Sequence, residues 1–134
     1  MTSVQARIVE EHASGQSREV IGTTLNTSRI LVKRDGRGYF VKLAEIDWIE
    51  ADRNYVRLHI GTATHTIRER ISHLEATLDP RLFARIHRST LVNLHRVREM
   101  QPWFSGDFLV ILDNGTRLRL SRHYRSRVES RIDA

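Results

Sequence analysis

Donor side chains alternate with apolar residues in the segment from Phe83 to Leu94, which reads FARIHRSTLVNL. Arg85, His87, Arg88 and Ser89 supply the donors. Arginine and histidine donors suit phosphate oxygens and guanine edges, and buried apolar neighbours would hold them in a fixed orientation. The segment therefore predicts a surface that packs on one side and faces a partner on the other.

Two other segments carry the same kinds of side chain. Residues 53–55 (RNY) lie between two strand-like runs, and residues 122–125 (RHYR) open the last helical run. Arginine and asparagine can make bidentate contacts with guanine and adenine edges, whereas His, Ser and Tyr more often contact phosphates. Each segment alone could be ordinary loop polarity, but the three together favour contacts with DNA.

The positive charge is concentrated in the C-terminal part of the chain. Residues 1–80 hold 11 basic and 11 acidic side chains, whereas residues 81–134 hold 11 basic and 5 acidic ones. All 11 basic residues of the second part are arginine, whose planar fork suits phosphate and guanine. The excess predicts a polyanionic partner. The alternative is a protein-interaction module that docks an acidic partner through this basic C-terminal face.

Several other classes of chemistry lack their motifs. The chain has no cysteine, which excludes thiol catalysis and disulfides and fits a reducing compartment. The patterns GxSxG, HExxH, GxxxxGK and GxGxxG are missing, so we expect no enzyme activity, no metal site and no nucleotide cofactor. There is no apolar run of about 20 residues and no signal-peptide pattern, so we expect a cytoplasmic protein.

Aromatic residues are few, which bears on the kind of nucleic acid. Single-strand and RNA binding use exposed aromatic side chains as stacking platforms. Only 7% of the residues are aromatic, and Trp48, Phe83, Trp103 and Phe108 occupy positions that predict burial in the core. Duplex DNA is therefore the favoured partner.

Short strands and turns are predicted to position the three segments. Asp-Gly and Asn-Gly pairs predict hairpins that join RILVKR to YFVKL, around residues 35–38, and Phe108–Leu112 to Thr116–Leu120. Strands are also predicted for IDWIEA, YVRLHI, THTIR and HRVREMQPWF, the last with Val97, Met100 and Trp103 as packing residues. Helices are predicted over RERISHLEATL and, capped by Ser121, over RHYRSRVESRID.

These elements predict a single, mostly β domain with two or three short helices. Residues 1–27 have only scattered apolar positions and are expected to form an N-terminal tail or linker, with the domain over residues 28–134. A helix-turn-helix needs two adjacent amphipathic helices, and strands occupy the middle of this chain. If the domain binds DNA, loops must make the contacts.

The run from Phe40 to Tyr124 resembles the LytTR DNA-binding domain, an output module of bacterial response regulators. The matching pieces are IDWIEADRNYVRLHI at 46–60, IRERISHLEATLDPRLFARIHRSTLVNLHRV at 67–97 and LDNGTRLRLSRHY at 112–124. They occur in the family's order over about 80 residues. The phrase FARIHRSTLVN, followed by NG and then LSR, is the most specific of these features.

The resemblance implies an elongated set of small antiparallel sheets whose loop side chains enter successive major grooves, commonly at paired direct repeats. Carried over to this chain, the family's contact positions coincide with the three segments above. The base-reading candidates are Arg53, Asn54, Arg88, and Arg122 or its neighbour His123. The candidates for phosphate contact or positioning are Tyr55, Arg85, His87, Ser89, Arg119, Tyr124 and Arg125.

The resemblance leaves the regulatory context open. Family members usually carry an N-terminal receiver domain of about 120 residues, which residues 1–27 are too few to form. The chain is expected to be either a stand-alone regulator, governed by a separate protein, or the C-terminal domain of a longer one. Paired direct repeats would also allow a homodimer on DNA.

Overall fold

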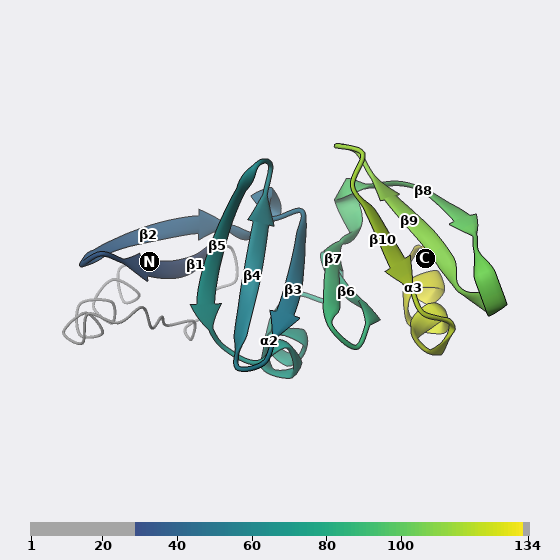
Figure 1. Ribbon diagram of the computed structural model, residues 1–134, viewed down its shortest axis with the longest axis horizontal. Helices are drawn as coiled ribbons and strands as arrows, with labels where there is room; N and C mark the ends of the chain where they lie inside the picture. The colour runs from purple at the N-terminus through teal and green to yellow at the C-terminus, as the bar shows by residue number, and fades with distance from the viewer. Residues whose placement is uncertain (1–28, 133–134) are drawn as a thin grey trace.

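Three small antiparallel sheets follow one another along the long axis of the molecule (Figure 1). The strands are β1 (Arg29–Arg34), β2 (Arg37–Lys42), β3 (Trp48–Asp52), β4 (Tyr55–Ile60), β5 (Ala63–Arg68), β6 (Phe83–His87), β7 (Thr90–Asn93), β8 (Val97–Pro102), β9 (Phe108–Leu112) and β10 (Arg117–Leu120). The sheets have the orders β1-β2, β5-β4-β3-β7-β6 and β10-β9-β8. This computed structural model describes residues 29–132, so the predicted tail at residues 1–27 lies outside the described residues.

Helices are short and few in the described part of the chain. The α-helices are α2 (Ile71–Thr77) and α3 (Arg125–Ile132), and the 3-10 turns are η2 (Leu43–Glu45), η3 (Leu94–Arg96), η4 (Phe104–Gly106) and η5 (Arg122–Tyr124). Strands β6 to β10 separate the two α-helices, so the predicted mostly β fold without a helix-turn-helix is confirmed. Each helix within residues 29–132 is too short or too polar to cross a membrane.

The two hairpins predicted from their turn residues form, and the turn of the first is shorter than predicted. In the first hairpin the turn is Asp35-Gly36 alone, because Arg37 already pairs with Arg34. Both turn residues have positive φ, 54° and 77°, which gives the tight turn whose twist matches that of paired strands. In the second, the backbone N–H of Leu112 donates to Thr116 at 2.9 Å.

Both helices are shorter than their sequence patterns predict. Helix α2 begins only at Ile71 because β5 continues to Arg68, which pairs with Tyr55 of β4. The final helix opens as the 3-10 turn η5, in which the Ser121 hydroxyl accepts a hydrogen bond from the His123 N–H at 3.2 Å. Ser121 therefore caps the element as predicted, although the α-helical part starts later.

The β6–β7 hairpin separates two hydrophobic cores and contributes side chains to both. Phe83 and Leu91 belong to the core beneath β1 to β5 and α2, whereas Ala84, Ile86 and Val92 belong to the core shared with β9, β10 and α3. Because successive side chains on a strand point to opposite faces, one hairpin can serve both cores. This double burial fixes the position of its turn.

The prediction that Trp103 packs in the core is wrong. Trp103 is 44% exposed and the neighbouring Phe104 is 69% exposed. The last strand pair before the turn joins Pro102 to Phe108, so both aromatic residues lie in the β8–β9 connection. That connection lies at the far end of the molecule, where no further element covers it (Figure 1).

Candidate nucleic-acid interface

The segment FARIHRSTLVNL forms the β6–β7 hairpin, whose two-residue turn is Arg88-Ser89. Five of its apolar side chains are buried, and Arg88 at the tip is exposed. A register shift between Arg85 and His87 marks an irregularity just before the turn. Such bulges redirect side chains near functional sites, and here the irregularity adjoins the predicted contact residues.

All three predicted contact segments lie along one edge of the molecule. The β3–β4 turn, the β6–β7 turn and the end of β10 occupy the lower edge in Figure 1. Two backbone hydrogen bonds link them: the N–H of Ala51 donates to Ser89 at 2.9 Å, and the N–H of Ser121 donates to Ile86 at 2.9 Å. The middle segment is therefore fixed to both of its neighbours.

The β3–β4 turn presents two unshielded polar side chains. Arg53 and Asn54 are exposed, and Arg53 has a φ of 64°, a backbone conformation that is uncommon for residues other than glycine. Arg53 makes no hydrogen bond or ion pair with any residue in the described part of the chain. The guanidinium is therefore free to contact a partner. Tyr55, which follows, is 41% exposed.

Arg85 lies inside the fold and not at the surface. Its side chain is 11% exposed, and Nη1 donates to the Glu75 carboxylate at 2.6 Å. Nε donates to the carbonyl of His87 at 3.0 Å and Nη2 to that of Arg88 at 2.6 Å. Arg85 thus supports the β6–β7 turn from within, which leaves little of its guanidinium for a partner.

His87 is held in its neutral form with a defined tautomer. The backbone N–H of Ser89 points at Nδ1 from 3.2 Å, so Nδ1 accepts and the proton resides on Nε2. Burial lowers the pKa of His87, and the positive charges of Arg119 and Arg88 lower it further. At neutral pH the ring is therefore an uncharged hydrogen-bond donor through Nε2.

A buried carboxylate organises the end of β10. Asp107 accepts hydrogen bonds from the backbone N–H of Arg122 at 2.9 Å and from Nε of Arg119 at 2.7 Å. These bonds, the backbone one first, keep the pKa of Asp107 below its usual value. The carboxylate thereby stays ionised and fixes both arginines. Nη1 of Arg122 also donates to the carbonyl of Ser105 at 3.4 Å.

A cavity of about 580 Å³ brings the second and third contact segments together. It is lined by His87, Arg88, Arg119, Ser121, His123, Tyr124 and Arg127. Its described lining includes three arginines and no carboxylate; Arg119 and Arg127 are paired with carboxylates outside the lining, and Arg88 forms no ion pair in the described part of the chain, so an anion would bind chiefly through Arg88. We call these residues the cationic cavity. Five of its seven lining residues were candidates from the sequence; Ser121 was predicted only as a cap.

The sequence reasoning missed Arg127 and included a neighbour that points elsewhere. Nη1 of Arg127 donates to Glu75 at 2.6 Å, and the guanidinium carbon lies 4.7 Å from the centre of the Tyr124 ring. The three-residue spacing from Tyr124 is the one sequence signal that could have identified Arg127. Arg125 pairs with Glu129 at 3.1 Å and stacks over Phe108, outside the cationic cavity.

Curated relatives of this chain are regulators of greater length. It is 29% identical over 93 residues to the transcriptional regulatory protein LytR of Staphylococcus aureus (strain N315), covering 69% of this chain and 38% of that protein. It is 30% identical over 88 residues to the sensory transduction protein LytR of Streptococcus agalactiae, covering 66% of this chain and 36% of that protein. The chain thus spans little more than a third of their length.

A solved LytTr DNA-binding domain, from a response regulator of Bacillus cereus, has the same fold. The match covers 81% of this chain and 100% of that one, with a TM-score of 0.73 and 24% identity. In addition, the model of the family described as "LytTr DNA-binding domain" matches residues 36–133 of this chain. That family is one of DNA-binding domains and not of enzymes, which confirms both the resemblance and the expectation of a non-enzyme. The chain belongs to the LytTR family of DNA-binding domains.

Proposed function

We propose that this domain binds duplex DNA sequence-specifically through the edge that carries the β3–β4 turn, the β6–β7 turn and the start of η5. The observation that supports this most is the arrangement of these segments on one edge, tied together by backbone hydrogen bonds from Ala51 and Ser121. Side chains held on a rigid support can read a surface without reordering on contact.

We propose that some side chains of this edge contact base edges and that others contact phosphates. Only the major groove distinguishes all four base pairs, so turns that read sequence should enter it, and three segments in a row could reach successive grooves. The exposed Arg53, Asn54, Arg88, Arg122 and His123 are the proposed base readers. His87, Ser89, Arg119, Tyr124 and, on the first turn, Tyr55 are the proposed phosphate contacts, with Arg125 beside them. Arg85 instead holds the middle turn.

At the level of the whole protein, we propose a bacterial transcription regulator. The curated relatives are named as transcriptional regulatory or sensory transduction proteins, which favours this role. We further propose cytoplasmic action, binding of two copies to paired direct repeats, and control by a separate regulatory protein or by a domain of a longer chain. Residues 28–134 would form the DNA-binding unit, preceded by a tail at residues 1–27.

Binding should fall steeply as salt is added. Each phosphate contact contributes about −0.9 to the slope of log K against log salt, so three contacts would weaken binding roughly 40-fold between about 50 and 200 mM salt. A gel-shift titration of the parent chain on duplex DNA at several salt concentrations measures the slope. A flat plot would argue against a phosphate-dominated interface. Binding of polyglutamate in preference to duplex would favour the acidic-partner alternative.

A further inference from the structure

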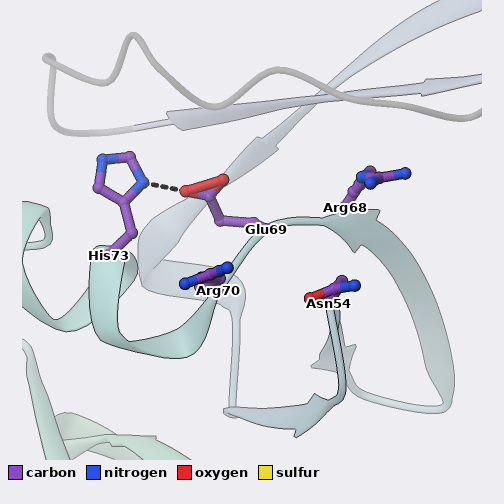
Figure 2. A pocket seen from close by; sticks show the side chains of 5 residues that line it. All are labelled: Asn54, Arg68, Glu69, Arg70 and His73. Carbon is purple, nitrogen blue, oxygen red and sulfur yellow. Dashed lines mark hydrogen bonds and ion pairs between the residues drawn. The ribbon is translucent and has the colours of Figure 1, made fainter.

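A second cleft, of about 400 Å³, lies beside the β3–β4 turn. Its lining residues are Asn54, Arg68, Glu69, Arg70 and His73. Figure 2 shows Asn54 on the turn, with Arg68 at the end of β5 and Arg70 in the short connection between β5 and α2. The cleft therefore combines a proposed base reader with two arginines that have no role so far.

The charge of this cleft is positive because its two arginines outnumber its one carboxylate. Glu69 is hydrogen-bonded to Nδ1 of His73, and the two side chains turn toward each other in Figure 2. The Glu69 side chain is only 18% exposed. Arg68 and Arg70 are both exposed, and neither forms an ion pair with a carboxylate among residues 29–132. Two solvent-facing cations thus remain for a ligand.

The cleft is continuous with the proposed DNA-binding edge. Arg68 pairs across the sheet with Tyr55, which directly follows Asn54. The guanidinium carbon of Arg68 lies 5.9 Å from the centre of the Tyr55 ring. A duplex that contacts the β3–β4 turn would bring its backbone close to these arginines. The anionic groups of that backbone are phosphodiester oxygens, to which arginine donates hydrogen bonds readily.

We propose that this cleft is a further phosphate-binding site, in which Arg68 and Arg70 contact the DNA backbone next to the groove that the β3–β4 turn enters. The inference rests on the proposed function, because it places the cleft on the same duplex. It extends the proposed interface from the β3–β4 turn to Arg68 and Arg70, which were not among the site candidates from the sequence.

Arg68→Ala and Arg70→Ala should each reduce the slope of log K against log salt by about 0.9. If variant and parent bind equally at about 1 M salt, each variant should bind roughly eightfold more weakly than the parent at about 0.1 M salt. The loss should be equal on a duplex selected for binding and on one of random sequence, because phosphates carry no sequence information. Arg117→Ala is the matched control, since Arg117 is exposed at the end of β10 away from Ser121.

Glu69→Gln provides a test whose expected result is tighter binding, which a loss of folding would not produce. Removing this negative charge while keeping a polar partner for His73 should tighten binding to both duplexes. If the parent binds duplex DNA but the two arginine variants keep its slope, the cleft is not a phosphate site and the proposed function still stands. A loss confined to the selected duplex would also overturn the phosphate assignment. If the parent binds no duplex at all, the proposed function itself fails.

Discussion

Arg88→Ala is expected to weaken binding to a selected duplex by about 1–3 kcal/mol, and to affect a random duplex much less. Arg88 is exposed at the tip of the β6–β7 turn. Its carbonyl is held by Arg85 at 2.6 Å, and the carbonyl of Ser89 is held by Ala51 at 2.9 Å. Because these bonds fix the backbone of the turn, the proposed contact would start from a fixed position of the Arg88 Cα. Arg122→Ala should behave similarly, and gel-shift titrations measure both.

Arg88→Lys separates base reading from phosphate contact. Lysine keeps the charge but lacks the planar fork that grips guanine in a bidentate manner. A base reader should therefore stay impaired on the selected duplex with lysine, whereas a phosphate contact should recover. Arg117→Ala removes the same charge from an exposed position on β10 and should change little. Equal losses on both duplexes for Arg88→Ala, restored by lysine, would rule out base reading by this residue.

Asn93→Ala is expected to lower the free energy of unfolding by about 2–3 kcal/mol, since it leaves several buried groups without partners. Asn93 is fully buried in β7. Its amide nitrogen donates to the carbonyls of Ile46 at 2.9 Å and Ala44 at 3.3 Å, and its side-chain oxygen accepts from the His95 N–H at 2.8 Å. These bonds attach the β6–β7 hairpin to the chain that enters β3. Urea unfolding with an unchanged m-value measures the effect.

Asn54→Ala is the matched control for this stability effect. Asn54 is exposed on the β3–β4 turn, so its removal should change the free energy of unfolding by no more than about 0.5 kcal/mol. It should nevertheless weaken binding to the selected duplex, because it is a proposed base reader. Equal urea midpoints for the two asparagine variants would show that the Asn93 hydrogen bonds do not hold the hairpin in place.

Local patterns were sufficient to predict most strands. The alternation of Val56 and Leu58 with polar neighbours requires one buried face, and both residues are fully buried. Asn114-Gly115 likewise predicts its hairpin from the positive φ that the turn needs, and Gly115 has a φ of 89°. The prediction that Trp103 is buried was wrong, because its burial depends on whether another element covers the end of β8. No local pattern contains that information.

The residue types of the candidate site were predictable from the sequence, but which of its donors are available to a partner was not. Arg85 and Arg88 are similar in sequence terms, yet one is committed to Glu75 from α2 and the other is exposed. The cationic cavity arises because β10 lies against β6, as the bond from Ser121 to Ile86 shows, although 35 residues separate these two in the chain. Long-range contacts of this kind decide which donors remain available to a partner.

Selection of bound duplexes from a random pool tests the central claim most directly. The parent chain should enrich one sequence motif, arranged as two direct repeats, and the Arg88→Ala variant should lose preference at a defined position within each repeat. Recovery of duplexes with no shared motif, at the same yield for parent and variant, would contradict sequence-specific reading by the three-segment edge.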